Sequence, residues 1–381
     1  MDDTSVFEHG EYHGHPQVMF FSDAASGLRA IIAIHRLRSG RSGGGIRFYP
    51  YASGAAALTD VLRLSRAMTY KMVFCGVPVG GGKTVILGDP KTEKSPELLR
   101  AFGRIVDGLG GRYICAPDVG TNAHDMAVIR EQTEFVTGLP GSGGNTAIPT
   151  ARGVFEGIRA AVGFKYGRND LEGMRVAVQG VGGVGSSLCA HLCDAGAQLV
   201  VSDVDEAALT HVVGESGAQA VDPAEILFAD VDILAPCALG GVLNDQTIPK
   251  LRASIVCGGA NNQLAETRHA VMLKDCGILF APDYVVNGGG VLGGAAQVGL
   301  ITKAQMEASL RGIGETAMRI FRIAEERGVS TEEAASSLAE EKLLEEGEQP
   351  LLTQLPRSSS VLRRSRLRVS PKISRYSALG P

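Results

Sequence analysis

The chain has 381 residues, which at roughly 150 residues per domain predicts two or three domains, each with a sizeable core. Hydrophobic residues make up 44% of the chain and charged residues 20%, which excludes wholesale disorder. The net charge of −4 gives no general attraction to nucleic acid or to an anionic membrane. The sequence has no apolar run of roughly 18 residues and no apolar segment at its N-terminus, so we expect neither a transmembrane helix nor a signal peptide.

Glycine is the unusual component. The chain contains 50 glycines, near twice the usual share of about 7%, and they cluster as GGG or GxG. This clustering excludes collagen, which needs glycine at every third position, and it indicates close approach of backbone to ligands. Seven cysteines are scattered without the paired CxxC spacing of zinc or redox sites. We therefore expect reduced thiols in a cytoplasmic protein and no metal site.

The first 140 residues are predicted to form an α/β domain. Residues 17–37 hold two apolar runs around a turn-rich segment, which predicts a β-hairpin. The elements expected after it are a strand at 45–51, a helix with Ser53 as its N-cap, a strand at 83–87, a helix that begins after Ser95, and a strand at 112–118. Alternation of strands and helices on this scale is typical of α/β domains.

A glycine-rich connection at 138–147 predicts a hinge between two domains. From Met174 onward, short apolar strands alternate with helices in the manner of a Rossmann-type, doubly wound sheet. The predicted divisions are a first domain at 1–140, a dinucleotide-binding domain at 141–295, C-terminal helices at 296–346 and a tail at 347–381.

The tail differs in composition from the rest of the chain. Between Glu348 and Pro381 there are seven basic residues, one acidic residue, SSS and RRSR runs, and no periodicity. These features are typical of disorder. Basic tails can contact nucleic-acid phosphates, but Tyr376 is the only aromatic residue here that could stack on bases, so we expect no nucleic-acid partner.

Residues 180–185 read GVGGVG and match the GxGxxG pattern. The pattern lies between a predicted strand and a predicted helix, where the first glycine makes a tight turn, the second admits a pyrophosphate and the third lets helix and strand pack closely. The alternative is a glycine turn without a ligand. The expected cofactor contacts are Gly180, Val181, Gly182, Gly183, Val184 and Gly185, with helix N-terminal amides on the phosphates.

Asp203 closes the next predicted strand, about 20 residues beyond the glycines, where an acid bonds ribose hydroxyls. A 2′-phosphate would meet Asp203, Asp205 and Glu206 and no nearby arginine. We therefore predict NAD, rather than NADP, as the cofactor.

Three charged residues in the first half are candidates for chemistry. Lys83 follows three glycines, which would place it in a glycine-lined recess. Burial there lowers the pKa of a lysine towards the pH at which the enzyme works, as acid/base chemistry requires. The alternative is a solvated lysine at a strand edge. A phosphate loop is excluded, because Val77 stands where that pattern needs glycine. Lys71, at the end of an apolar helix, either snorkels or binds an anion. Asp118 ends a strand at the edge where α/β sites form, or else caps the next helix.

Seven blocks of the sequence together resemble one family. In order they are MTYK, GGGKTVILGDP, YICAPDVGT, GVGGVG, APCALGG, CGGANNQL and APDYVVNGGG. From about Val18 to Leu344 the chain resembles the glutamate/leucine/phenylalanine/valine dehydrogenases, and most closely the branch that acts on apolar amino acids. The resemblance implies NAD-dependent oxidative deamination of a leucine-, valine- or phenylalanine-type L-amino acid to the 2-oxo acid and ammonium. It also implies a homo-oligomer, with the site in a cleft between an N-terminal α/β substrate and oligomerisation domain and the dinucleotide-binding domain.

The resemblance assigns roles to single residues. Lys71 would pair with the substrate carboxylate, Lys83 would activate the water that attacks the imino carbon, and Asp118 would transfer protons to and from the amino group. The amide of Asn261 offers both a donor and an acceptor to cofactor and substrate. The residues expected to hold the nicotinamide are Thr150, Cys237, Ala238, Ala260, Asn261 and Asn262.

Two positions depart from the family pattern. At Gly43 and Gly294 the chain has glycine where the family usually has apolar side chains. Both residues, together with Gly44 and Val291, are expected to line the substrate site. Either the pocket is larger and accepts an aromatic side chain, or the site is looser and activity is reduced. A catalytically degraded homologue that acts as a binding or assembly protein is therefore the alternative function.

Overall fold

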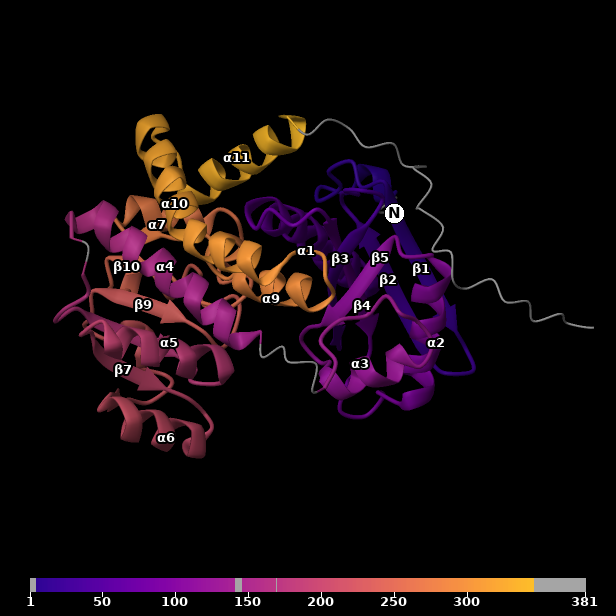
Figure 1. Ribbon diagram of the computed structural model, residues 1–381, viewed down its shortest axis with the longest axis horizontal. Coiled ribbons are helices and arrows are strands. Elements are labelled where there is room, and N and C mark those ends of the chain that lie inside the picture. Colours follow the sequence, from indigo (N-terminus) through magenta and orange to yellow (C-terminus); the bar gives the residue numbers. More distant parts are fainter. Residues whose placement is uncertain (1–4, 141–145, 169, 346–381) are drawn as a thin grey trace, which may run out of the picture.

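Two α/β lobes, joined by helices that pack against both, make up the computed structural model, which describes residues 5–140, 146–168 and 170–345 (Figure 1). The predicted tail at 347–381 and part of the predicted hinge at 138–147 lie outside the described residues. The boundaries drawn at 140, 295 and 346 stay predictions.

The N-terminal lobe is built on a five-stranded mixed sheet in the order β1-β2-β4-β3-β5. Its strands are β1 (Gln17–Asp23), β2 (Leu28–Ile34), β3 (Ser42–Tyr49), β4 (Gly80–Leu87) and β5 (Tyr113–Pro117). Strands β1 and β2 pair antiparallel with Gln17 opposite Ile34, which confirms the predicted hairpin. Strand β3 pairs in parallel with both β4 and β5, so the carboxyl ends of these three strands lie at one edge of the sheet.

Helices cover both faces of this sheet, and local sequence sets where they begin. Ser53 caps α1 (Gly54–Phe74) by accepting a hydrogen bond from the backbone of Ala56, as predicted. Ser95 caps α2 (Pro96–Gly108), which has proline at its first position. One apolar cluster joins α1 to the sheet, and a second joins α2 and α3 (Ala123–Arg130) to it.

Strand β4 begins earlier than its sequence predicts. Glycine is poorly suited to strands, so the prediction started the strand at 83, but Gly80, Gly81 and Gly82 already belong to it. A Cβ at Gly81 would lie 2.1 Å from the backbone nitrogen of Thr69 in α1. Gly81 is therefore required because α1 packs directly against the backbone of β4, whereas a Cβ at Gly80 would meet the backbone of Arg36 and one at Gly82 the ring of Tyr113.

The second lobe holds a six-stranded parallel sheet in the order β11-β10-β9-β6-β7-β8. The strand order reverses beside β6, which confirms the doubly wound prediction. The strands are β6 (Arg175–Gln179), β7 (Gln198–Ser202), β8 (Gln219–Ala220), β9 (Ile233–Pro236), β10 (Ile255–Val256) and β11 (Leu279–Phe280). The accompanying helices are α4 (Ala147–Tyr166), α5 (Gly183–Asp194), α6 (Glu206–Ser216) and α7 (His269–Asp275).

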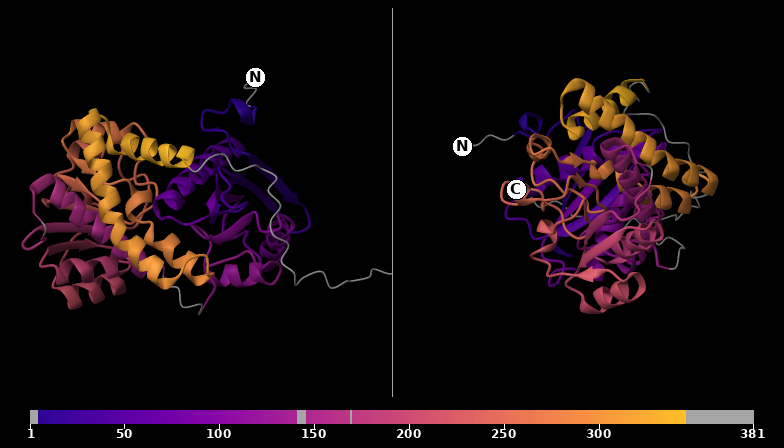
Figure 2. Two further views of the ribbon diagram at one scale, coloured as in Figure 1. Left: turned by 45° about the horizontal axis from the view of Figure 1, so that its top comes forward. Right: turned by 90° about the vertical axis from the view of Figure 1, so that its left-hand side faces the viewer.

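Four further helices complete the chain: α8 (Asp283–Val286), α9 (Gly289–Gln297), α10 (Lys303–Arg327) and α11 (Thr331–Glu345). Helix α10 packs along α4, where the rings of Phe321 and Phe164 lie 5.5 Å apart. Helix α11 turns back and packs on α1, so the C-terminal helices contact both lobes (Figure 2). An apolar cluster that includes Tyr70, Tyr284 and Leu338 fills the space between them.

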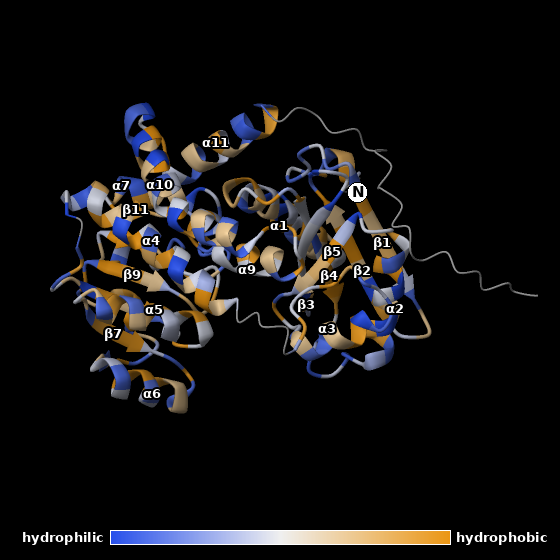
Figure 3. Cartoon of the chain, viewed as in Figure 1, coloured by the Kyte–Doolittle hydropathy of each residue, from blue (hydrophilic) through white to orange (hydrophobic). Residues whose placement is uncertain are grey.

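Apolar residues concentrate in the strands of both lobes, while the outer helices carry many hydrophilic positions (Figure 3). None of the helices in the described residues has the length and apolar character needed to cross a membrane.

Candidate active site

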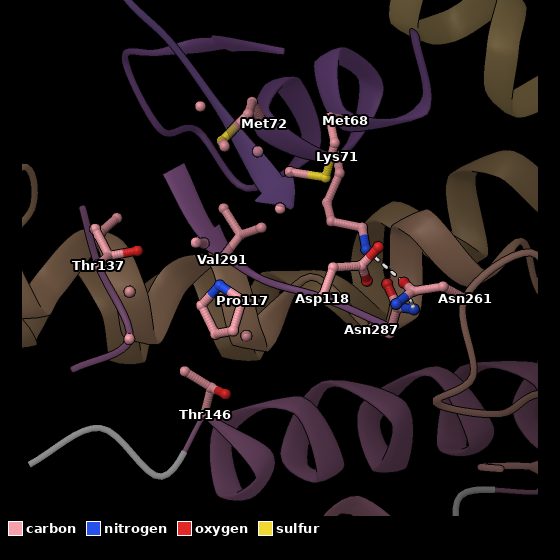
Figure 4. Close-up of a pocket in the computed structure, with 18 of the residues that line it drawn as sticks. Met68, Lys71, Met72, Pro117, Asp118, Thr137, Thr146, Asn261, Asn287 and Val291 are labelled. Carbon is pink, nitrogen blue, oxygen red and sulfur yellow. Dashed lines mark hydrogen bonds between the residues drawn. The ribbon is translucent and has the colours of Figure 1, made fainter. Parts of the chain in front are cut away.

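A cavity of about 480 Å³ lies between the two lobes (Figure 4). The N-terminal lobe contributes residues of β3, β4, α1 and the end of β5, and the second lobe contributes residues of α4, α8, α9 and the loop after β10. In Figure 4, apolar Met72, Val291 and Pro117 lie on one side of the view, and the amides of Asn261 and Asn287 lie on the other. The cavity therefore has an apolar part and a polar part.

The structure brings all of the predicted catalytic and substrate residues together. The predicted residues that line the cavity are Gly43, Gly44, Lys71, Lys83, Asp118, Thr150, Val184, Asn261, Asn262, Val291 and Gly294. The predicted cofactor residues outside its lining are Gly180, Val181, Gly182, Gly183, Gly185, Asp203, Cys237, Ala238 and Ala260. This second group lies at or near the carboxyl edge of the parallel sheet, at the ends of β6, β7, β9 and β10.

Lys83 and Asp118 form a buried ion pair. The Lys83 Nζ atom lies 2.8 Å from Asp118 Oδ2, and the two side chains are 6% and 10% exposed. The alternative of a solvated lysine at a strand edge is therefore wrong. Asp118 does not cap the next helix either, because Asn122 caps α3.

Arg47 completes this charged group. Its Nε donates to Asp118 Oδ2 at 3.2 Å, and its other end pairs with Asp60 at 3.0 Å, which also accepts from the hydroxyl of Tyr51. Burial by itself would raise the pKa of Asp118, but the charges of Lys83 and Arg47 outweigh it and lower that pKa to about 2. Asp118 is therefore an anion throughout the neutral range.

Lys71 is buried and faces the second lobe. Its Nζ donates to Asn261 Oδ1 at 3.0 Å, and Asn287 Nδ2 donates to the same oxygen at 3.0 Å (Figure 4). Burial lowers the pKa of Lys71, and Lys83 adds to that effect, while Asp283 opposes it. No ion pair of Lys71 is found among the described residues, so its ammonium group has donors free for an anionic ligand.

Among the lining residues that were not predicted are Arg47, Asn287 and Gly45. Arg47 follows shortly after the predicted Gly43 and Gly44, but its contact with Asp118 depends on the pairing of β3 with β5. Asn287 precedes a glycine run that predicts only a turn, yet its Oδ1 is buried without a hydrogen-bond partner. A Cβ at Gly45 would lie 2.7 Å from Asp118 Cβ, so glycine is needed there for the ion pair to form.

The two small positions differ in how much space they leave. A Cβ at Gly43 would lie 3.4 Å from Met72 Cε and 3.6 Å from Val79 Cγ1, in ordinary contact, so neighbouring side chains already fill that side. A Cβ at Gly294 would have no atom within 4 Å. The volume gained by glycine is therefore on the α9 side of the cavity.

The glycine-rich turn after β6 fits a dinucleotide. Gly180 has a φ of 88°, which favours glycine, and a Cβ at Gly185 would lie 1.9 Å from the Gly180 carbonyl oxygen. In contrast, a Cβ at Gly182 would meet nothing within 4 Å, which leaves room for phosphate groups at the N-terminus of α5.

Asp203 lies beside this turn and follows β7. Its Oδ2 accepts from the backbone nitrogen of Val181 at 2.6 Å, and its Oδ1 accepts from that of Asp205 at 2.9 Å. The carboxylate is partly exposed and fixed in place. The role of Asp203 as a ribose-binding acid stays a prediction.

Two family profiles match the chain. Residues 15–135 match the Glu/Leu/Phe/Val dehydrogenase dimerisation domain, and residues 202–349 match the glutamate/leucine/phenylalanine/valine dehydrogenase domain. Together they cover most of the chain, on both sides of the cavity.

Individual relatives are similar over almost their whole length. Leucine dehydrogenase of Geobacillus stearothermophilus is 46% identical over 341 residues, which cover 89% of this chain and 93% of that enzyme. Phenylalanine dehydrogenase of Caldalkalibacillus thermarum is 43% identical over 337 residues, covering 86% of this chain and 91% of that one. The crystal structure of L-tryptophan dehydrogenase from Nostoc punctiforme has a TM-score of 0.74 at 44% identity, covering 87% and 96% of the two chains.

The depressed pKa of Asp118 predicts a contribution to acid stability. A carboxylate whose pKa is lower in the folded state than its usual value of about 3.9 stabilises the fold above that value and loses this contribution as the pH falls towards about 2. Between pH 5 and pH 3 we expect wild type to lose about 1 kcal/mol more free energy of unfolding than Asp118→Asn. Urea titrations at both pH values measure this difference.

The matched control is Asp107→Asn, which changes an exposed aspartate on α2. It should follow the wild-type pH dependence. Equal pH dependence of Asp118→Asn and wild type would show that the ion pair does not hold Asp118 in its charged form.

Proposed function

Because the chain belongs to the glutamate/leucine/phenylalanine/valine dehydrogenase family, and is an amino acid dehydrogenase, we propose that it catalyses NAD-dependent, reversible oxidative deamination of an apolar L-amino acid. The products would be the 2-oxo acid, ammonium, NADH and a proton, and water supplies the oxygen. The family recognised from sequence blocks is confirmed. The observation that carries the proposal is the meeting of Lys71, Lys83 and Asp118 in one cavity between the lobes.

Lys71 would bind the substrate carboxylate. It is a buried cation with free donors, and its partner Asn261 fixes the direction of its side chain. Asn287 is bonded to the same oxygen and has an unpaired Oδ1 of its own, an acceptor suited to the substrate ammonium. The α-carbon would then lie between these groups and the Lys83–Asp118 pair.

Lys83 and Asp118 would move the protons. The Asp118 carboxylate, anionic at neutral pH, would accept a proton from the substrate ammonium group. Lys83 would orient the water that attacks the imino carbon and stabilise the negative charge that develops on its oxygen. Arg47, bonded to Asp60 as well, would keep the Asp118 carboxylate in place throughout.

The glycine turn at 180–185 would hold the pyrophosphate of NAD, and Asp203 would bond the ribose hydroxyls. Bound NAD supplies the acceptor for the hydride of the α-carbon. Thr150, Cys237, Ala238, Ala260, Asn261 and Asn262 would hold the nicotinamide end. The carboxylate of Asp203 supports NAD over NADP, because it would repel a 2′-phosphate.

The alternative, a catalytically degraded homologue that acts in binding or assembly, lacks support. The charged residues that the chemistry needs are present, buried and in contact. A protein freed from catalysis would have no reason to keep a buried ion pair that is costly to desolvate.

We also propose a homo-oligomer in the cytoplasm. The match of residues 15–135 to a dimerisation domain supports self-association. Seven free cysteines support a reducing compartment, where unpaired thiols persist.

A panel of L-amino acids with NAD or NADP tests the proposed function. We expect NADH formation at alkaline pH with leucine, valine and phenylalanine, and none with glutamate, because the side-chain end of the cavity is apolar. NAD should exceed NADP in kcat/KM by at least about tenfold, or ~1.4 kcal/mol. No turnover with any apolar amino acid would refute the proposal, and equal use of both cofactors would refute the role of Asp203.

Lys83→Ala tests the chemistry apart from cofactor binding. We expect kcat to fall by about 10²- to 10⁴-fold, the range for a general acid/base group, while the NAD dissociation constant stays within about twofold. Stopped-flow turnover and fluorescence titration measure the two quantities. Lys303→Ala, at an exposed lysine on α10, is the control and should behave as wild type. If Lys83→Ala keeps most of its kcat, Lys83 is not part of the mechanism.

Gly294→Val tests the size of the substrate pocket. The open space at Gly294 supports acceptance of aromatic or long aliphatic side chains alongside valine. Filling it should shift the phenylalanine-to-valine ratio of kcat/KM towards valine by about tenfold or more, since one methylene is worth ~1 to 3 kcal/mol in such pockets. Gly312→Val, at another helical glycine with open space, controls for the effect of valine in a helix. An unchanged ratio would show that Gly294 does not contact the substrate.

A further inference from the structure

A second cavity, of about 570 Å³, lies against the first. It is lined by residues of α1, α8, α11 and the loop after β10, and Asn262, Asp283 and Tyr284 line both cavities. Asp283 is therefore a carboxylate in the wall between the proposed active site and a second polar space. The proposed mechanism gives it no role.

The hydrogen bonds of Lys71 do not balance its positive charge. It is buried, its partner Asn261 is neutral, and the described residues provide no ion pair for it. The charged and titratable groups that act on it are Asp283 of α8, Lys83 of β4, Cys75 at the end of α1, and Asp118 after β5. Asp118 is already in contact with Lys83 and Arg47, so Asp283 is the anion available to Lys71.

Asp283 is fixed where it can act on Lys71 from a distance. Its Oδ2 accepts from the backbone nitrogen of Gln263 at 2.9 Å, and α8 packs directly against α1. A carboxylate in direct contact with Lys71 would compete with the substrate carboxylate for the same donors. A carboxylate set further back stabilises the cation and leaves the donors free.

The groups around Asp283 on its other side are also defined. Glu332 of α11 faces it and accepts a hydrogen bond from the hydroxyl of Tyr284 at 3.1 Å. Burial raises the pKa of Glu332 to about 7, and Asp283 adds to that effect. Arg63, Arg66 and His13 line the second cavity further out, and Glu340 there accepts from the hydroxyl of Tyr70 at 2.7 Å.

We propose that Asp283 is a positioning residue for the substrate carboxylate: it keeps Lys71 cationic inside the closed site without occupying its donors. The inference rests on the proposed function, in which Lys71 binds that carboxylate. Burial lowers the pKa of Lys71 and also raises that of Asp283, so each charge depends on the other. Removing the negative charge leaves Lys71 with neutral hydrogen-bond partners, with the repelling charge of Lys83, and with the smaller attraction of Asp118, which is already paired with Lys83 and Arg47.

The test is the pH dependence of carboxylate binding. The ligand is the 2-oxo acid of leucine, bound to the enzyme with NADH and without ammonium, so that no group on the ligand titrates between pH 7 and pH 10.5. Calorimetry or NADH fluorescence gives the dissociation constant at each pH. In Asp283→Asn we expect the loss of affinity to begin at least about one pH unit lower than in wild type, a rise of about tenfold in the dissociation constant above that point.

Two variants separate charge from structure. Asp283→Glu keeps the charge and should restore the wild-type profile to within about 0.3 pH unit. Glu340→Gln removes another carboxylate of the second cavity, one that is not among the charges acting most strongly on Lys71, and should leave the profile unchanged. If Asp283→Asn does not fold, Asp283→Glu gives the test by itself, because a profile shifted to lower pH in that variant would contradict the inference.

The outcomes are distinct. A wild-type profile in Asp283→Asn, or equal shifts in Asp283→Asn and Glu340→Gln, would overturn the role of Asp283 and leave the proposed function intact. Wild-type enzyme that neither binds the 2-oxo acid nor forms NADH from any apolar amino acid would instead refute the proposed function.

Discussion

The buried ion pair between Lys83 and Asp118 is the constraint on which the N-terminal lobe depends. Two charges removed from water are stable only in close contact with each other and with further donors, which Arg47 supplies here. To bring the two charges together, β3 must pair in parallel with both β4 and β5, and the residues of β3 nearest to the ion pair must carry almost no side chain. A Cβ at Gly44 would lie 1.7 Å from the Gly82 carbonyl oxygen, and one at Gly45 would overlap Asp118. Gly44 and Gly45 are thus required for Lys83 and Asp118 to meet.

The second constraint joins the lobes. Lys71 belongs to the N-terminal lobe, but its hydrogen-bond partner Asn261 belongs to the second, so the proposed carboxylate site is complete only when the lobes lie as they do here. Helices α10 and α11 hold this arrangement, since one packs on α4 and the other on α1. The chain therefore uses its C-terminal helices to fix the distance between the proposed proton-transfer pair and the glycine-rich turn.

The sequence predicted features whose causes are local. The hairpin of β1 and β2, the Ser53 cap and the turn at 180–185 depend on residues close in the chain, and all were recognised. The early start of β4 was missed because contact with Thr69 overrides the low strand propensity of glycine. Arg47 and Asn287 were missed because their partners, Asp118 and Asn261, come from other elements. Lys83 and Asp118 were candidates from their positions in the sequence, but only the family resemblance gave them roles, since composition and spacing left their alternatives open.

The shape of the cavity also indicates which lobe would discriminate between substrate side chains. On the β3 side, Met72 and Val79 already lie in contact with the space beside Gly43, so glycine at this position adds little volume to the cavity. On the α9 side, the space beside Gly294 is open.

Helix α9 packs on α4, the first helix of the second lobe, and so belongs structurally with the dinucleotide site. Charge recognition and proton transfer would then depend mainly on the N-terminal lobe, whereas discrimination by size would depend on the lobe that holds the cofactor. A side chain that fits badly against α9 would thereby disturb the distance between the α-carbon and the hydride acceptor, which affects kcat as well as KM.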